Sequence, residues 1–239
     1  MLGSFLRRLF ADLSALIYDD GCIICGEHVD EELEGLCMRC RFEMPVTRYS
    51  LQSDNPVKEY FESIMPIVEA SSFLHFKTDD RWRRMIHRLK YNNEWRLGLT
   101  FGEMYGAELK KSGLYDDIDL IIPIPLHPFK MLKRGYNQSE YIAEGISHEL
   151  GAKVDRSTVY RRRNNPSQTK QRSLDRWSNV DNLFAVRNPK RLRHKHILLV
   201  DDVLTTGATL TSCLYAIQRD APTCRVSIAT LAVAGRIKR

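Results

Sequence analysis

Residues 197–209 read Ile-Leu-Leu-Val-Asp-Asp-Val-Leu-Thr-Thr-Gly-Ala-Thr and place apolar, acidic and hydroxyl-bearing side chains in one short run. The hydrophobic residues 197–200 predict a strand buried on both faces, and a helix is expected from residue 208. Backbone N–H groups at a helix N-terminus attract anions, and a glycine lets the backbone come close to a phosphate. The residues expected to surround such a phosphate are Thr205, Thr206, Gly207, Ala208 and Thr209.

Asp201 and Asp202 stand between that strand and the anion-binding loop, where a phosphate would repel them. Carboxylates accept hydrogen bonds from vicinal hydroxyl groups. They also favour the positive charge that grows on C1 of a ribosyl group when its leaving group departs. The run is therefore typical of a site for a sugar with both a phosphate and a diol, and both acids are catalytic candidates. A chance Asp-Asp turn is the plainer alternative.

A pyrophosphate leaving group would need cations nearby, and two stretches supply them. The first follows the apolar run at 120–125 and ends in Arg134-Gly135-Tyr136-Asn137-Gln138. The second is the basic loop 161–179, which contains Gln171, Arg172 and Arg176. A loop of this kind can close over a reactive cation and keep water out. An ordinary turn and a solvated run of charges are the alternatives.

Four of the six cysteines form the pairs Cys22-x-x-Cys25 and Cys37-x-x-Cys40. Four thiolates at this spacing predict a tetrahedral Zn²⁺ site. Such a site is structural, because four protein ligands leave no open position for catalysis. An apparent binding energy of ~10–16 kcal/mol would be enough to hold together a small element with almost no core.

The net charge of +6 is unevenly distributed. Residues 156–196 carry 12 Lys and Arg against 2 Asp and Glu, whereas residues 1–50 carry 5 against 9. The basic stretch favours a polyanionic ligand, of which single-stranded DNA is one example. The acidic N-terminal region is not expected to be the main DNA-binding surface. A basic stretch that only aids solubility is the alternative.

The composition, with 43% hydrophobic and 28% charged residues, is that of a soluble globular protein. No apolar run reaches 18 residues, so no membrane span is expected. Apolar residues in segment 1–20 recur at helical spacing, which favours an amphipathic helix over a signal peptide. Cysteine pairs of the metal-binding kind fit a reducing compartment, so we expect a cytoplasmic protein.

From about residue 67 the sequence alternates strand and helix signals, which predicts an α/β fold with a parallel sheet covered by helices. Strands are expected at about 67–76, 119–125, 196–200 and 225–233, and helices at about 80–90, 97–111, 137–150 and 208–219. In the first helix, Trp82, Met85, Ile86 and Leu89 share one face. Asn137 is expected to cap the third.

Three regions are expected along the chain. Residues 1–48 would hold the N-terminal helix and the zinc-binding element, and residues 67–239 the main domain. Residues 49–66 contain Ser, Asp, Asn and two prolines and are expected to form a linker.

Taken together, these motifs resemble the ComF family of competence-associated, type I phosphoribosyltransferase-like proteins. The resemblance rests on the cysteine pairs, Leu89-Lys90-Tyr91, Pro123-x-Pro125, the segment 134–138, the basic loop and the run 197–209. These features span nearly the whole chain. The resemblance implies the type I phosphoribosyltransferase fold, a mainly parallel sheet flanked by helices.

The resemblance also assigns roles at the site. It implies that Asp201 and Asp202 hold the ribose hydroxyls of phosphoribosyl pyrophosphate, while residues 205–209 wrap its 5′-phosphate. It places Lys90, Arg134, Gly135 and the basic loop near the pyrophosphate. Mg²⁺ would bridge pyrophosphate and ribose oxygens and be held mostly through substrate and water.

Three functions remain open. The chain could transfer a phosphoribosyl group to an acceptor, handle single-stranded DNA together with DNA-uptake proteins, or sense phosphoribosyl pyrophosphate without turnover. A nucleoside 5′-monophosphate would fit the same groove. The acceptor is not identified, and Tyr91 and Trp95 are expected in the core rather than on a nucleobase.

Overall fold

The computed structural model describes residues 21–29, 35–76, 81–91, 94–162 and 183–235. The chain divides into two compact units, Met1–Met44 and Pro45–Arg239. The described part of the first unit contains helix α2 (Met38–Phe42) and a bridge between Gly21 and His28. The helix predicted within residues 1–20 lies outside the described residues.

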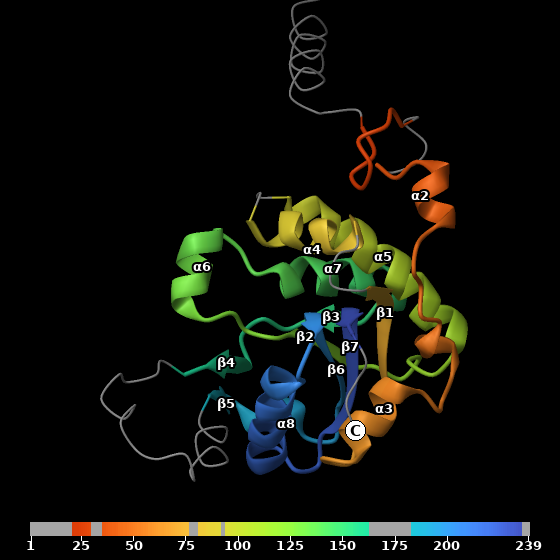
Figure 1. Cartoon of the computed structure of the whole chain (residues 1–239). Helices are drawn as coiled ribbons and strands as arrows, with labels where there is room; N and C mark the ends of the chain where they lie inside the picture. Colours follow the sequence, from red (N-terminus) through yellow and green to blue (C-terminus); the bar gives the residue numbers. More distant parts are fainter. Residues whose placement is uncertain (1–20, 30–34, 77–80, 92–93, 163–182, 236–239) are drawn as a thin grey trace, which may run out of the picture. The chain divides into compact units, whose positions relative to one another are not determined.

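The second unit is built on a five-stranded parallel sheet in the order β1-β7-β6-β2-β3 (Figure 1). The strands are β1 (Ala70–Phe76), β2 (Leu120–Pro123), β3 (Lys153–Val154), β6 (His196–Leu204) and β7 (Arg225–Ala234). Because they all run in one direction, their carboxyl ends meet at one edge, where α/β folds bind ligands. The expected α/β class with a parallel sheet is confirmed.

The central strand β6 is longer than predicted. Ile197 and Val200 are fully buried, as expected for a parallel strand covered on both faces. Pairing with β7 continues through Asp201, opposite Thr230, to Leu204, opposite Val233. The two acids therefore lie on the strand itself, and the loop begins only after Leu204.

Helices cover both faces of the sheet. On one side lie α4 (Arg81–Tyr91), α5 (Trp95–Ser112) and α7 (Gln138–Leu150), and on the other α3 (Pro56–Glu62) and α8 (Ala208–Asp220) (Figure 1). None of the described helices has the length and apolar character needed to cross a bilayer.

The packing of α4, α5 and α7 follows from their sequences. α4 buries Trp82, Met85, Ile86 and Leu89, which confirms the predicted apolar face. α5 and α7 approach each other closely at glycines. A Cβ added to Gly102 of α5 would lie only 2.5 Å from the carbonyl oxygen of Ile142 on α7, so a larger residue would push the helices apart.

Residues 49–66 differ from the linker expected. They contain the 3-10 helix η2 (Tyr49–Leu51) and α3, and Val57 and Phe61 are fully buried in the core of the second unit. Pro56 is at the start of α3, where a missing N–H costs nothing. Prolines that indicated a linker thus begin a helix.

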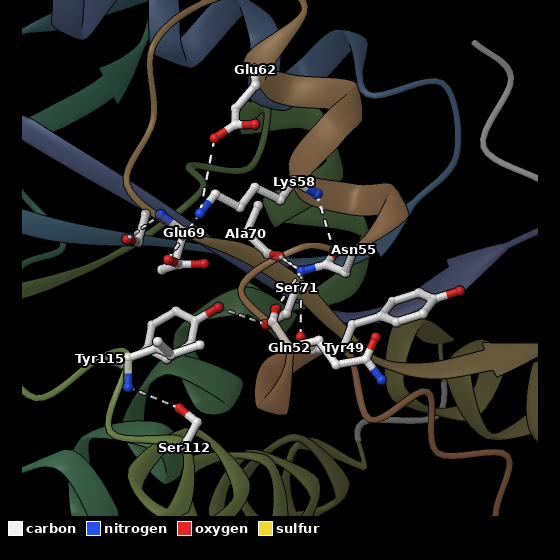
Figure 2. A network of polar contacts seen from close by, with 12 residues as sticks. Tyr49, Gln52, Asn55, Lys58, Glu62, Glu69, Ala70, Ser71, Ser112 and Tyr115 are labelled. Atoms are coloured by element: carbon white, nitrogen blue, oxygen red, sulfur yellow. Dashed lines mark hydrogen bonds and ion pairs between the residues drawn. The ribbon is translucent and has the colours of Figure 1, made fainter.

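Asn55 fixes the start of α3 (Figure 2). Its Oδ1 accepts hydrogen bonds from the N–H groups of Val57 and Lys58, at 3.0 and 3.1 Å. Its Nδ2 donates to the carbonyl of Ala70 on β1 at 2.9 Å and also to the carbonyls of Tyr49 and Gln52. One buried amide therefore ties α3 to the sheet.

Three of the elements that were not anticipated lie close to the end of β6 or between β2 and α7. β4 (Val159–Arg161) and β5 (Phe184–Val186) pair antiparallel, apart from the main sheet. Helix α6 (Pro128–Arg134) falls in a stretch expected to be a loop, and it buries none of its residues. A helix without a buried face has no hydrophobic periodicity to reveal it.

Candidate functional site

A cavity of about 560 Å³ lies where β6 ends. It is lined by Asp201 and Asp202 of β6 and by Thr205 and Thr209 of the following loop and helix. Its five cationic residues come from two helices, α4 and α6, and from β4, and they are Arg83, Lys90, Lys130, Arg134 and Arg161. The structure thus brings the predicted acids, the loop and two of the predicted cations into one cavity.

The Asp201 carboxyl is held by donors on both sides. Ser139 Oγ donates to its Oδ1 at 3.0 Å, and the backbone N–H of Asp202 donates to the same oxygen at 2.9 Å. Burial, together with repulsion from Asp202, raises the pKa of Asp201 to about 7. The side chain therefore takes up a proton near neutral pH when no cationic or hydroxyl-bearing ligand faces it.

Asp202 is neutralised differently, by an ion pair. Its Oδ2 lies 2.9 Å from Lys90 Nζ, and both side chains are largely buried. Lys90 was predicted on the pyrophosphate side, and here it contacts an acid predicted to hold the sugar. An anionic ligand entering the cavity would compete with Asp202 for this ammonium group.

Residues 203–210, which comprise the end of β6, the following loop and the start of α8, contain no charged residue. Gly207 has φ +70° and precedes α8 as its N-cap without a side-chain cap bond. A recess of about 30 Å³ is formed by residues 203–210 and Asp201. This recess lies at the N-terminus of a 13-residue helix, where backbone N–H groups favour anions.

Arg134 is positioned by the segment that follows it. Its Nη1 donates to Gln138 Oε1 at 2.8 Å. Gly135 ends α6 with φ +79° and does not itself line the cavity. Asn137 caps α7 as predicted and donates to the carbonyl of Ile124 at 3.0 Å. These bonds hold α6, with Arg134 and Lys130, against the mouth of the cavity.

Arg161 begins the basic loop that was predicted on the pyrophosphate side, although it was not itself named as a site residue. It ends β4, lines the cavity and lies over the ring of Phe184, 5.5 Å from its centroid. Its Nε is buried and has no hydrogen-bond partner among the described residues. Burial lowers the pKa of its guanidinium, and the charge of Asp201 opposes that shift. Ser139 and Arg83 were likewise not predicted, because only the fold brings them to this edge.

The other predicted pyrophosphate residues, Gln171, Arg172 and Arg176, lie outside the described residues. Tyr91 corrects a different expectation, since its side chain is 48% exposed rather than in the core. The guanidinium of Arg134 lies 5.2 Å from its ring centroid. Hydrogen bonding and charge from Arg134 lower the pKa of Tyr91.

The four paired cysteines of the first unit form a cluster. The Sγ atoms of Cys22, Cys25, Cys37 and Cys40 all lie within 4.8 Å of one another. A tetrahedral site with Zn–S bonds of about 2.3 Å needs sulfurs about 3.8 Å apart. Burial and the other three thiols raise the pKa of Cys40. This cluster could hold a metal ion.

Comparisons with known proteins agree with this geometry. Residues 137–239 match the phosphoribosyl transferase domain. The chain is 24% identical over 206 residues to Competence protein F of Haemophilus influenzae, covering 79% of this chain and 86% of that protein. It is 26% identical to Competence protein ComFC of Streptococcus pneumoniae, covering 84% and 83%.

A shorter similarity links the chain to DNA utilization protein YhgH of Escherichia coli, with 27% identity over 57% of this chain and 60% of that protein. Among solved structures, a hypoxanthine phosphoribosyltransferase from Staphylococcus aureus aligns with a TM-score of 0.37 and 17% identity, over 62% of this chain and 68% of that one. The allosteric regulatory enzyme of purine biosynthesis aligns with a TM-score of 0.39 and 13% identity, over 56% of this chain and 26% of that one.

The raised pKa of Asp201 predicts a pH-dependent stability. The folded chain holds this proton up to about pH 7, whereas an unfolded aspartate releases it near pH 3.8. The folded state therefore binds more protons between these values, and the free energy of unfolding falls as pH rises through them. Asp201→Asn removes this effect, so it should raise the free energy of unfolding above that of the wild type by more at pH 8 than at pH 5.

Thermal unfolding at the two pH values measures the difference. One pKa unit corresponds to about 1.4 kcal/mol, or about 3–6 °C in a domain of this size. The gain in Tm from Asp201→Asn should therefore be at least about 3–6 °C larger at pH 8. An equal change in Tm at both pH values would contradict the assignment.

Proposed function

We propose that this chain, a member of the ComF family of phosphoribosyltransferase-like proteins, binds phosphoribosyl pyrophosphate in the cavity at the end of β6. The observation that carries this proposal is the juxtaposition of two acids and a charge-free anion cradle with five cations. The 5′-phosphate lies in the loop 205–209, and the ribose hydroxyls donate to Asp201 and Asp202. A nucleoside 5′-monophosphate fits the same two subsites.

The pyrophosphate faces the cationic wall. We assign to this side Lys90, Arg134 and Gly135, which ends α6. Gln171, Arg172 and Arg176 of the basic loop are assigned to the same side. Arg83, Lys130 and Arg161 line the same cavity. Mg²⁺ accompanies the donor and is held mainly by donor oxygens and water, since this ion keeps part of its hydration shell.

The proposed reaction is transfer of the phosphoribosyl group to an acceptor of unidentified structure. The C1–O bond to pyrophosphate breaks, pyrophosphate leaves with the electron pair, and the acceptor forms a bond to C1 and loses a proton. Asp201 and Asp202 stabilise the positive charge on C1 during this exchange. A sensor that binds the donor without turnover would use the same contacts but release no pyrophosphate.

Binding and turnover can be tested separately. Calorimetry should show that the wild-type chain binds phosphoribosyl pyrophosphate with Mg²⁺ and that Asp201→Asn/Asp202→Asn weakens binding at least about tenfold, because charged hydrogen bonds to both hydroxyls are lost. Asp116→Asn, on the exposed turn after α5, is the matched control and should bind as the wild type does.

Absence of binding by the wild type, or unchanged affinity in the double variant, would refute the proposal. Mg²⁺-dependent release of pyrophosphate in the presence of candidate acceptors then distinguishes a transferase from a sensor.

A second proposed function, handling of single-stranded DNA, is favoured by the surface beside the cavity. Phe129 and Leu132 of α6 are 78% and 85% exposed. Lys133 and Arg134 of the same helix lie over the ring of the exposed Tyr91. Aromatic rings among cations are the features on which unpaired bases stack while the backbone is held by charge. The names of the relatives, Competence protein F and DNA utilization protein, point the same way.

Among the described residues of the basic stretch 156–196, some cations pair with acids of the fold. Arg191 lies 3.2 Å from Asp155, and Lys195 lies 2.7 Å from Asp119. These cations are partly neutralised within the fold. We therefore assign the DNA-binding surface to α4 and α6, and DNA-uptake proteins remain the proposed partners.

Fluorescence anisotropy with a short single-stranded oligonucleotide tests this assignment. Tyr91→Ala/Phe129→Ala should weaken binding about tenfold, since each stacked base contributes about 1–3 kcal/mol. Affinity should also fall steeply with salt. Phe42→Ala is the control, because Phe42 is 92% exposed on the acidic first unit. Salt-independent binding, or equal loss in both variants, would count against it.

We further propose that the four-cysteine cluster holds a structural Zn²⁺ and that the protein is cytoplasmic, where paired thiols stay reduced. Elemental analysis should find one zinc per chain. Cys40→Ser should lose the metal, because one of four ligands is removed. Cys224→Ser, a buried thiol of the second unit, should keep it. Zinc retained in the Cys40 variant would exclude this site.

A further inference from the structure

We propose that Tyr60 of α3 is a positioning residue for the phosphate loop. Its Oη donates a hydrogen bond to the backbone carbonyl of Thr206 at 2.9 Å, across 146 residues of sequence. Its ring also lies against Gly207. This inference rests on the proposed function, because it assigns a role to Tyr60 in holding the loop that receives the 5′-phosphate.

The hydrogen bond from Tyr60 to the carbonyl of Thr206 also fixes the direction of the next backbone N–H, because the peptide bond is planar. The described residues contain no cis peptide bond, so the carbonyl of Thr206 and the N–H of Gly207 point in opposite directions. When Tyr60 holds the carbonyl, the N–H of Gly207 is turned away from Tyr60 and into the loop. Tyr60 thereby orients one of the backbone N–H donors on which phosphate binding by the loop 205–209 depends.

The ring acts on the same peptide by contact. A Cβ added to Gly207 would lie 2.7 Å from both Cε1 and Oη of Tyr60. Gly207 therefore has no room for a side chain on this face, and its φ of +70° is one that other residues rarely adopt. Tyr60 fills the space that the glycine leaves and limits movement of the loop toward α3.

Tyr60 can hold the loop because α3 is itself fixed. The neighbouring Phe61 is fully buried and packs edge-on against the Tyr60 ring, with centroids 4.9 Å apart. Lys58 Nζ lies 2.9 Å from Glu69 Oε1, next to the bonds from Asn55 to β1 (Figure 2). α3 is therefore anchored to the start of β1, and Tyr60 on this helix holds the loop after β6.

The test compares Tyr60→Phe with Tyr215→Phe. Tyr215 is on α8, and no hydrogen bond of its hydroxyl occurs among the described residues. Tyr60→Phe keeps the ring and removes only the bond to Thr206. It should weaken binding of ribose 5-phosphate and of phosphoribosyl pyrophosphate about three- to tenfold, the usual effect of one neutral hydrogen bond. Binding of inorganic pyrophosphate and Mg²⁺, which occupy the other side of the cavity, should not change.

Amide hydrogen exchange of the ligand-free chain supplies a readout that does not depend on any ligand. Exchange at Thr206 and Gly207 should accelerate in Tyr60→Phe and stay as in the wild type in Tyr215→Phe. If the wild type binds neither phosphorylated sugar but exchange accelerates, the positioning role stands and the proposed function fails. If the wild type binds both and Tyr60→Phe matches it in affinity and exchange, the positioning role is refuted.

Discussion

Two neighbouring carboxylates at the buried end of a strand cannot both be ionised unless donors or cations surround them, and the site is arranged around this constraint. Asp201 receives hydrogen bonds from Ser139 of α7 and from the next backbone N–H, and Asp202 receives the ammonium group of Lys90 from α4. The fold must therefore bring α4 and α7 to the end of β6 even before any ligand enters. The same contacts prepare the cavity, because an entering anion finds its cations already present.

The proposed phosphate and leaving-group subsites use two different physical means. Residues 203–210 have no charged side chain, so they can hold the proposed phosphate only through backbone N–H groups, threonine hydroxyls and the helix N-terminus. The opposite wall relies on long cationic side chains, which are less sensitive to small displacements. The accuracy of the site therefore depends on the loop conformation, whereas its charge depends on α4, α6 and β4.

Much of this arrangement could be predicted, and the parts that could not share a cause. The run 197–209 revealed a strand, two acids and a helix start because all of its information is local. Ser139 reaches Asp201 only through the sheet order, which places β2 and the helices that follow it beside β6. Arg161 lines the same cavity from β4, which pairs with β5 outside the main sheet. α6 and α3 were missed because one buries no residue and the other begins with a proline that also signals a linker. Tyr91 was assigned to the core because aromatic residues usually pack there, and the adjacent cations of α6 were not visible in the local pattern.

The segment that matches the phosphoribosyl transferase domain begins at residue 137, yet the cavity is not closed by that segment alone. Four of its five cations precede residue 137, namely Arg83, Lys90, Lys130 and Arg134. Tyr60 precedes it as well, and contacts the loop that the match includes. The matched segment contains the two acids and the loop 205–209, to which the proposed function assigns the ribose hydroxyls and the 5′-phosphate. The preceding residues set how tightly these groups are held and which charges face them, so the ligand preference of this chain depends on both parts.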